Sequence, residues 1–362
     1  MNATEELHNL GQSLWLDNIS RELLDSGTLK HYIDDFSITG LTSNPTIFDK
    51  AITHGNLYDE AISRISTEGK SSEALFFDLA LEDLTRAADL FRPIHVATDG
   101  VDGWVSLEVS PLLVNDTTGT VRAAAQLSAK AQRVNLFIKI PGTPAGIPAI
   151  EESIAAGIPI NVTLLFSREH YLAAAEAYMS GLERRIAAGL APDVTSVASL
   201  FVSRWDVAVV DKVQGEYQNR LGIAIAMRTY KAYCDLLASP RWLKLAAAGA
   251  RPQRLLWAST GVKNPGVPDT LYINALAAPN TVNTIPEKTL LAFAEHGKVG
   301  GVLPPNEGYA EALLAEFTRD GINDEALAAE LQREGAESFA KSWDDLLSNL
   351  AAKAQSFRVA GS

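Results

Sequence analysis

Residues 135–142 are Asn-Leu-Phe-Ile-Lys-Ile-Pro-Gly (NLFIKIPG), a short apolar run that carries one lysine and ends at a Pro-Gly pair. This length and composition are typical of a β-strand. Because successive side chains of a strand point to opposite faces, Phe137 and Lys139 share one face, and the isoleucines that flank the lysine share the other. The segment therefore predicts a strand with a lysine near its carboxyl end.

Short segments with strand character recur along the chain and alternate with longer amphipathic segments. The eight expected strands are Ser13–Asn18, Ile38–Asn44, Trp104–Ser110, Val134–Pro141, Ile158–Phe166, Val194–Val202, Leu255–Ser259 and about Thr281–Ile285. The helices expected between them include Ser71–Phe91, Arg168–Ala187 and Arg220–Ala238. Strands that alternate with helices pair in parallel through crossover connections, and eight such units close into a barrel. We therefore predict an α/β fold, a (β/α)8 TIM barrel.

An open, doubly wound sheet is the alternative fold for this alternation. Neither of the glycine-rich motifs that usually accompany such a sheet, GxGxxG or GxxxxGK followed by Ser or Thr, comes after an early strand. We expect residues 1–362 to form a single domain, since barrels with added helices reach this length. Residues from about 304 to 357 are predicted to form a helical extension that packs on the barrel, after a loop at 297–308.

The composition favours a globular enzyme, with 47% hydrophobic and 21% charged residues. A formal net charge of −13 argues against a nucleic-acid-binding protein, which needs clustered Lys and Arg. An anionic substrate would then be held by a few well-placed cations. The mixed, acidic first ten residues do not resemble a signal peptide, and no apolar stretch has the length of a membrane span. We therefore expect a cytoplasmic protein without membrane or nucleic-acid partners.

Metal and thiol chemistry are not indicated. The one cysteine, Cys234, is expected to be a core thiol, because no second cysteine or nearby histidine accompanies it. The six histidines show no HExxH or paired spacing, and no loop follows the EF-hand pattern. We therefore expect a mechanism without metal or cofactor. The sequence leaves open whether the protein is a monomer or a homodimer.

Active sites of barrels lie at the carboxyl ends of the strands, so the polar residues there are the candidates for function. Glu108 lies on the face of its strand opposite to the apolar Val105 and Leu107. Lys139 lies on the same face of its strand as Phe137. The remaining candidates have the same parity relative to their apolar neighbours and are Asp17, Asn161 and Thr163. Ile160, Val162 and Leu164 are predicted to share the opposite face of that strand. Three ionisable and two neutral polar side chains are therefore expected to converge on one place.

Each candidate also has a structural interpretation. Lys139 could form a buried ion pair with Asp17 or Glu108 that holds the barrel together, although such pairs are costly to desolvate. Asp17 could cap the turn that follows it, because Asp accepts hydrogen bonds from free backbone donors. Thr163 and Asn161, taken singly, are ordinary barrel-filling residues. The combination of these residue types favours a catalytic site.

With the strands assigned, the sequence resembles the transaldolase family from about Ser13 to Asn283. The segments that carry the resemblance occur in the family's order, and they are LWLDNI, GLTSNPTIF, VSLEVSP, NLFIKIPGT, INVTLLFS, SVASLFVSR and LLWASTGVKNP. Motifs such as TSNPTIF and the lysine strand with its Ile-Pro are specific to the family. The resemblance implies a (β/α)8 barrel whose fourth strand carries a Schiff-base lysine.

The resemblance also implies roles for individual residues. Lys139 corresponds to the Schiff-base lysine, Asp17 to the acid/base aspartate, and Glu108 and Thr163 to the pair that holds a catalytic water. The implied substrate-binding residues are Asn44, Asn161, Ser199, Arg204 and Ser259. Many relatives have an arginine shortly after the serine of the seventh strand, whereas this chain has Lys263, which provides a point charge without the bidentate fork of arginine.

The implied reaction transfers a dihydroxyacetone unit between sugar phosphates. In the family it interconverts sedoheptulose 7-phosphate plus glyceraldehyde 3-phosphate and erythrose 4-phosphate plus fructose 6-phosphate, in the non-oxidative pentose phosphate pathway. A fructose 6-phosphate aldolase, which releases free dihydroxyacetone, is the nearest alternative, but those relatives are shorter and lack the acidic residue at Glu108. A sugar-phosphate sensor on a retained barrel is the alternative from another class, and the presence of Lys139, Asp17 and Glu108 together argues against it.

Overall fold

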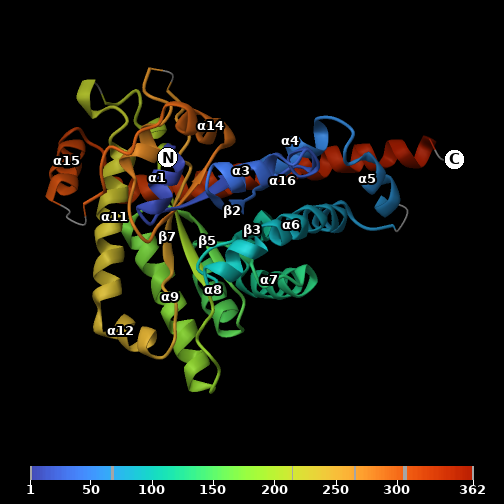
Figure 1. The fold of residues 1–362 in the computed structure, drawn as a ribbon, viewed down its shortest axis with the longest axis horizontal. Coiled ribbons are helices and arrows are strands. Elements are labelled where there is room, and N and C mark those ends of the chain that lie inside the picture. The colour runs from blue at the N-terminus through green and yellow to red at the C-terminus, as the bar shows by residue number, and fades with distance from the viewer. Residues whose placement is uncertain (1, 67–68, 214, 265, 305–307, 361–362) are drawn as a thin grey trace.

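The computed structural model describes residues 2–66, 69–213, 215–264, 266–304 and 308–360, and these form a closed barrel of eight parallel strands in chain order (Figure 1). The strands are β1 (Ser13–Asp17), β2 (Ile38–Thr42), β3 (Trp104–Glu108), β4 (Leu136–Pro141), β5 (Ile160–Leu165), β6 (Ser196–Phe201), β7 (Arg254–Ala258) and β8 (Val282–Ile285). Seven of them lie inside their predicted segments and are up to two residues shorter at an end, and β7 begins one residue before its predicted segment. The prediction of a (β/α)8 barrel is therefore confirmed, and the open sheet is excluded because β8 pairs with β1.

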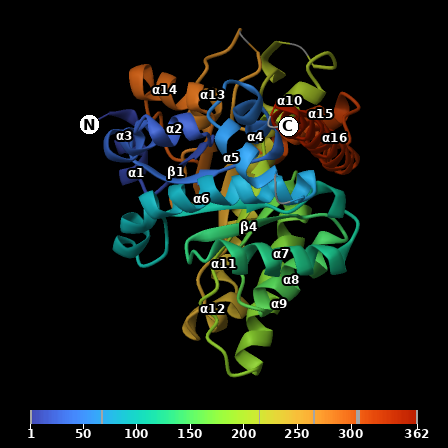
Figure 2. The same ribbon diagram turned by 90° about the vertical axis from the view of Figure 1, so that its right-hand side faces the viewer.

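Helices connect successive strands and cover the outside of the barrel (Figures 1 and 2). Before β4 they are α1 (Ala3–Asn9), α2 (Arg21–Asp25), α3 (Thr28–Asp35), α4 (Pro45–Thr53), α5 (Asp59–Ser66), α6 (Ser72–Ala97) and α7 (Thr117–Ala131), with a 3-10 turn η1 (Pro111–Leu113). After β4 they are α8 (Gly146–Ala155), α9 (Arg168–Ala187), α10 (Ser203–Ala208), α11 (Leu221–Ala238), α12 (Pro240–Ala247), α13 (Leu271–Ala275) and α14 (Glu287–His296), with η2 (Gly215–Tyr217). The predicted helix at residues 168–187 coincides with α9, whereas α6 continues beyond the predicted Phe91 to Ala97.

The end of β2 shows how local sequence sets an element boundary. The predicted strand extended to Asn44, but β2 ends at Thr42 because Asn44 is the N-cap of α4. The Asn44 side chain accepts a hydrogen bond from the backbone N–H of Ile47 at 3.1 Å, and Pro45 occupies the first helical position, where its missing N–H costs nothing. The Asn-Pro pair thus turns the chain from strand to helix directly at the barrel mouth.

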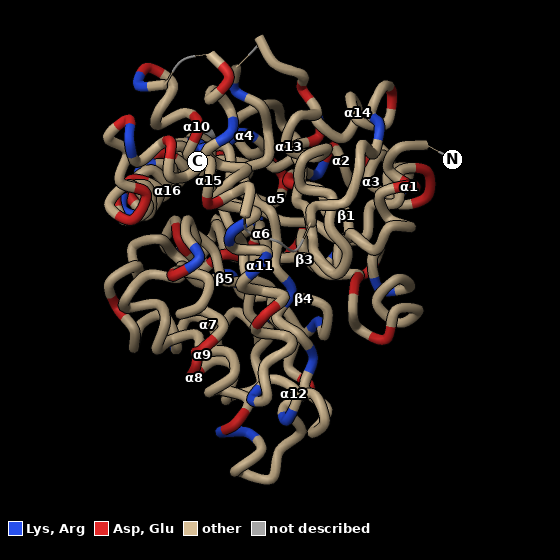
Figure 3. The backbone as a smooth tube through the Cα atoms, turned by 90° about the vertical axis from the view of Figure 1, so that its left-hand side faces the viewer, with Lys and Arg blue, Asp and Glu red and all other residues tan. Residues whose placement is uncertain are grey.

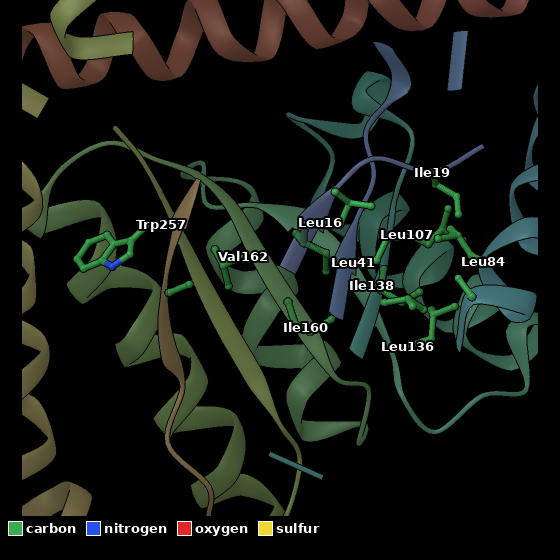
Figure 4. Close-up of a cluster of buried hydrophobic side chains, with 14 of the residues drawn as sticks. Leu16, Ile19, Leu41, Leu84, Leu107, Leu136, Ile138, Ile160, Val162 and Trp257 are labelled. Carbon is green, nitrogen blue, oxygen red and sulfur yellow. The ribbon is translucent and has the colours of Figure 1, made fainter. Parts of the chain in front are cut away.

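The strands divide their side chains between two hydrophobic layers, as the alternation predicts. The outward layer packs against the surrounding helices, and Figure 4 shows part of it, including Leu16, Leu107 and Ile138. The inward layer is aromatic toward the amino ends of the strands. There Phe137 stacks on Trp104 with ring centroids 4.0 Å apart, and Trp15 lies 6.1 Å from Phe137. These rings fill the barrel below the polar residues, so the interior is a packed core rather than a channel.

One predicted side-chain direction is wrong. Leu164 was expected on the same face as Ile160 and Val162, but it belongs to the second hydrophobic cluster with Phe166 and Phe201, while Leu165 takes the outward position. The cause is a break in register between Val162 and Leu165, where Leu164 has a φ of 58°. Left-handed backbone is strained for a residue with a bulky side chain such as leucine. It interrupts the strict alternation of side chains along the strand, so a prediction based on that alternation fails here.

The carboxyl-terminal part of the chain forms two helices, α15 (Gly308–Arg319) and α16 (Asp324–Ala360). Residues 297–304 of the predicted loop form no helix or strand, and Gly308, its last residue, already begins α15. Residues 305–307 lie outside the described residues. α16 runs alongside α4 (Figure 1), and its Trp343 ring packs edge-on against Phe76 at 4.9 Å. The predicted helical extension is therefore confirmed, and it consists of these two helices. None of the described helices combines the length and apolar content that a membrane crossing requires.

A polar network closes the amino end of the barrel. The Arg254 guanidinium donates hydrogen bonds to the Ser13 hydroxyl at 2.5 Å and to the backbone oxygen of Thr281 at 2.8 Å. The same guanidinium lies 4.0 Å from the Asp102 carboxylate, which also accepts from the Trp15 indole N–H at 2.7 Å. Both charged side chains are buried, so each depends on the other for compensation.

We predict that Arg254→Met destabilises the fold by about 3–5 kcal/mol, because it leaves Asp102 buried without a positive partner. Urea unfolding followed by circular dichroism measures the change. The double variant Arg254→Met/Asp102→Asn removes both charges and should recover part of the lost stability. An equal loss in the single and double variants would show that the pair contributes nothing.

Candidate active site

Lys139 stands on β4 with its amino group in the barrel mouth. Its Nζ donates to the Glu108 Oε2 at 3.2 Å and to the backbone oxygen of Ser43 at 3.0 Å. The pairing of β3 with β4 sets Glu108 directly beside Lys139 in register. The Lys139 side chain is 7% exposed and that of Glu108 is 5% exposed, so water contributes little to their solvation. The ion pair considered from the sequence therefore exists, and its partner is Glu108.

Burial dominates the titration of Glu108. Removing the carboxylate from water raises its pKa above the ordinary value, and the charge of Asp17 raises it further, while the positive charge of Lys139 opposes the shift. A carboxyl group in this position exchanges a proton more readily near neutral pH than an exposed one does. It is therefore suited to take a proton from, or return one to, groups bound at Lys139.

Asp17 has a similar environment on the other side of the mouth. Burial raises the pKa of its carboxyl group, whereas Lys139, a hydrogen bond from Thr42 and the charge of Lys263 oppose the shift. The Thr42 hydroxyl donates to the Asp17 Oδ1 at 2.8 Å. Asp17 does not cap the next helix, because the Ser20 side chain is the N-cap of α2. The capping interpretation of Asp17 is therefore not supported.

A neutral polar layer lies beside Lys139. On β5, the Asn161 amide donates to the Ser106 hydroxyl at 3.1 Å and accepts from the Ser199 hydroxyl of β6 at 2.7 Å. These bonds define the orientation of the Asn161 amide. Two buried oxygens on the strands that flank β4, the Glu108 Oε1 and the Thr163 hydroxyl, have no hydrogen-bond partner within the described residues. Buried polar atoms of this kind are normally satisfied by water or by a ligand.

Two cations and a strained serine lie on the loops that follow β6 and β7. Arg204 belongs to α10, immediately after β6, and burial lowers its pKa. Lys263 follows β7 and is near enough to Asp17 to lower the pKa of that carboxyl group. Ser259, at the end of β7, has a φ of 54° and lies 3.0 Å from the Ser203 hydroxyl. Left-handed backbone at a residue other than glycine is uncommon, and such residues cluster at functional sites.

These residues surround one cavity at the carboxyl ends of the strands. The predicted residues that line it are Asp17, Asn44, Lys139, Asn161, Thr163, Ser199, Arg204, Ser259 and Lys263. Glu108 is the one predicted residue behind this lining, where it contacts Lys139. Side chains from β1, β4 and β5 therefore meet as the strand parity predicts, and Ser199 of β6, which the resemblance implied, lies with them. Acidic and basic residues elsewhere are interspersed over the face seen in Figure 3.

The cavity also contains residues that the sequence did not single out. Thr42 and Thr284 contact each other at 2.5 Å and line the cavity beside Asp17. Strand alternation could have identified both of them. Thr42 lies two residues after Gly40, and Thr284 lies two residues after Val282, and both of these earlier positions face the barrel interior. Phe201 on β6 follows the same rule. Phe339, which reaches the cavity from α16, had no local signal in the sequence.

The fold and the site define a class of protein, namely a (β/α)8 barrel with a buried lysine near two carboxyl groups of raised pKa at the carboxyl ends of its strands. Within the described chain, no three His, Cys, Asp or Glu side chains gather in a way that could hold a metal ion. Residues 14–350 match the family model described as Transaldolase/Fructose-6-phosphate aldolase. The chain belongs to the transaldolase family.

Relatives from several bacteria match the chain over almost its whole length. A protein named Transaldolase from Parafrankia sp. (strain EAN1pec) is 45% identical over 95% of this chain and 96% of its own. The Transaldolase of Thermobifida fusca (strain YX) is 44% identical over 96% and 97% of the two chains. That of Thiobacillus denitrificans (strain ATCC 25259 / T1) is 42% identical over 97% of this chain and all of its own. The resemblance seen in the motifs up to Asn283 thus extends into the carboxyl-terminal helices.

We predict that Lys139→Met makes stability fall more steeply with rising pH. Lys139 is the largest opposing influence on the pKa of both carboxyl groups, so its removal raises both values further. A carboxyl group with a raised folded pKa stabilises the fold below its unfolded pKa, and this contribution is lost as the pH rises through the folded pKa. Urea unfolding at about pH 5 and about pH 8 measures the slope.

The matched control is Lys288→Met, which removes an exposed lysine from α14. This variant should keep the pH dependence of the unmodified protein. If both variants changed the slope equally, the effect would come from net charge rather than from the two buried carboxyl groups.

Proposed function

We propose that this protein is a transaldolase that transfers a dihydroxyacetone unit from a ketose phosphate to an aldose phosphate through a Schiff base on Lys139. The observation that carries the proposal is the position of the Lys139 amino group, which lies in the cavity and 3.2 Å from Glu108. The donor is sedoheptulose 7-phosphate or fructose 6-phosphate, and the acceptor is glyceraldehyde 3-phosphate or erythrose 4-phosphate. The reaction belongs to the non-oxidative pentose phosphate pathway.

Schiff-base formation begins with the unprotonated Lys139 amine, which attacks the C2 carbonyl of the donor. Glu108 accepts a proton from the lysine through their hydrogen bond, because burial makes its carboxylate a better base than an exposed one. The carbinolamine that forms must lose its hydroxyl group as water. A water between the unpartnered Glu108 Oε1 and Thr163 hydroxyl would satisfy both atoms and carry the required proton.

Bond cleavage uses the iminium as the electron sink. Asp17 takes the proton of the C4 hydroxyl group, the C3–C4 bond breaks, and its electron pair moves into the iminium to form an enamine on Lys139. The released C4 carbonyl belongs to the departing aldose phosphate. The hydrogen bond from Thr42 directs the Asp17 carboxylate, and its raised pKa favours holding this proton until the next step.

The second half of the reaction reverses these steps with a new aldose phosphate. The enamine attacks the acceptor aldehyde, Asp17 returns its proton to the new C4 oxygen, and water releases the ketose product from Lys139. Asn44, Asn161 and Ser199 bind the hydroxyl groups of the bound sugar and Ser259 completes the wall of the site. No cofactor is needed, because the lysine iminium itself stabilises the carbanion.

The phosphate group requires cations away from Lys139. Arg204 and Lys263 line the cavity and supply two positive charges in a chain whose net charge is −13. Arg204 can present two N–H groups to a phosphate, whereas Lys263 contributes a point charge that Asp17 shares. Arg204 is therefore the main phosphate ligand in this proposal.

The fructose 6-phosphate aldolase reaction is the nearest competing activity, and the family model includes both activities in its name. In the aldolase reaction the enamine on Lys139 is released as free dihydroxyacetone. Transfer is favoured here by the relatives named Transaldolase at 42–45% identity over nearly the full chain and by the acidic Glu108. Release of dihydroxyacetone from fructose 6-phosphate as fast as transfer to an acceptor would reverse this choice.

We predict that Asp17→Asn slows C–C bond cleavage by about 10²–10⁴-fold, since an amide cannot take the C4 hydroxyl proton. Iminium formation should survive in this variant. After incubation with fructose 6-phosphate, borohydride should trap an adduct on Lys139 that retains all six carbons and the phosphate. Peptide mass mapping identifies both the adduct and the modified residue.

The matched comparison for that experiment is Glu108→Gln, which should trap little adduct because its block precedes the iminium. Lys139→Ala should trap none. A three-carbon adduct formed at the normal rate by Asp17→Asn would show that another residue takes the proton. An adduct on a different lysine would overturn the assignment of Lys139.

We predict that Arg204→Ala raises KM for fructose 6-phosphate by roughly 10- to 150-fold, the value of a hydrogen bond to a charged group. Unphosphorylated dihydroxyacetone should form its Schiff base nearly as well as with the unmodified protein. Arg168→Ala, which removes an arginine at the start of α9, is the control. Equal losses for the phosphorylated and unphosphorylated compounds would mean that Arg204 has a structural role.

A further inference from the structure

The carboxyl-terminal helix α16 lies across the end of the barrel that holds the cavity. Gln332, Gly335 and Phe339 follow a spacing of three and four residues, so they share one face of the helix. The buried Gln332 amide donates to the backbone oxygen of Gly142 at 3.0 Å and to that of Leu164 at 2.9 Å. These bonds attach α16 to the carboxyl ends of β4 and β5, which are the strands of Lys139 and Thr163.

The same face of α16 contacts Arg204. The central carbon of the guanidinium lies 5.2 Å from the ring centroid of Phe201 on β6 and 5.8 Å from that of Phe339 on α16. No hydrogen bond or ion pair to this guanidinium exists within the described parts of the chain, although the charges of Glu334 and Glu108 act on it at longer range. The group is thus held by aromatic rings and keeps its N–H donors for another partner.

At Gly335 the backbone of α16 comes close to Arg204. A Cβ atom at this position would lie 3.0 Å from the Arg204 Nη1 and 2.9 Å from the Leu164 Cδ2. Glycine is among the least favourable residues in a helix interior, so its presence one turn after Gln332 requires a reason from packing. The reason here is space, because a larger residue would displace α16, the Leu164 methyl group or the guanidinium.

We propose that α16 is part of the phosphate subsite, with Gly335 and Phe339 as positioning residues that hold the Arg204 guanidinium toward the cavity. The inference rests on the proposed function, since it assigns a substrate phosphate to Arg204. Phe339 covers one side of the guanidinium and also lines the cavity itself. Without this ring the long arginine side chain gains rotational freedom and can turn toward the carboxylate of Glu334, which already acts on it.

The test measures Schiff-base trapping on Lys139 by borohydride as a function of donor concentration, with fructose 6-phosphate and with dihydroxyacetone. In Phe339→Leu the concentration of fructose 6-phosphate that gives half-maximal trapping should rise roughly 3- to 30-fold, the range of a cation–π contact. The half-maximal concentration of dihydroxyacetone and the maximal amount of adduct should not change. A merely structural role would affect both donors alike.

Three further variants sharpen the result. Gly335→Ala should raise the half-maximal concentration for fructose 6-phosphate alone, because the added methyl group meets the Arg204 guanidinium. Leu346→Val shortens a buried residue of α16 that belongs to the other hydrophobic cluster, and it should change neither donor. Adding Phe339→Leu to Arg204→Ala should cause no further loss, since the two residues act through one contact.

The possible outcomes separate the inference from the proposed function. Absence of any adduct in the unmodified protein would overturn both. Normal trapping in the unmodified protein, together with unchanged fructose 6-phosphate dependence in Phe339→Leu and Gly335→Ala, would overturn the inference alone. Equal losses for both donors in Phe339→Leu, or a matching loss in Leu346→Val, would also overturn it, because they would show loosening of α16 as a whole.

Discussion

The buried contact between Lys139 and Glu108 is the interaction on which the site depends. Neither side chain is more than 7% exposed, so each charge has exchanged water for the other charge and for a few polar groups. The exchange is costly, and replacing such a pair by apolar residues is often neutral or stabilising. The register that sets β3 beside β4 is thus difficult to explain by stability alone, and it is natural if the amine has chemistry to perform.

The polar groups at the two ends of the barrel differ in whether the protein itself provides their hydrogen-bond partners. At the amino end, Arg254 and Asp102 are linked through Ser13, and hydrogen bonds, including one from the Trp15 indole to Asp102, occupy their polar atoms. At the carboxyl end, the Glu108 Oε1 and the Thr163 hydroxyl have no partner in the described chain, and the Arg204 guanidinium rests on aromatic faces. Groups that are satisfied stabilise the barrel, whereas groups that keep free donors or acceptors are available to a substrate.

Much of this arrangement could be predicted because strands impose a strict alternation. A strand at residues 135–142 requires that Lys139 and Phe137 share a face, and the same parity predicts that Asp17, Glu108 and Asn161 lie with Lys139 at the mouth. The alternation failed at Leu164, where one left-handed residue shifts the register of β5. It also overextended β2, because the Asn-Pro pair at 44–45 begins a helix. Both errors come from backbone features that a periodic pattern does not contain.

The sequence by itself determined the eight strands, the order in which they alternate with helices and the faces of their side chains, because each of these depends on residues close together in the chain. Only the tertiary structure decided which carboxyl group pairs with Lys139. Asp17 and Glu108 are both predicted to face the barrel mouth, but Glu108 stands on the strand next to that of Lys139, whereas Asp17 stands on β1. The tertiary structure also decided that Phe339 covers Arg204, although 134 positions separate them. That contact arises because Gln332 and Gly335 let α16 lie close against β4 and β5, and such a close approach between distant segments leaves no local pattern in the sequence.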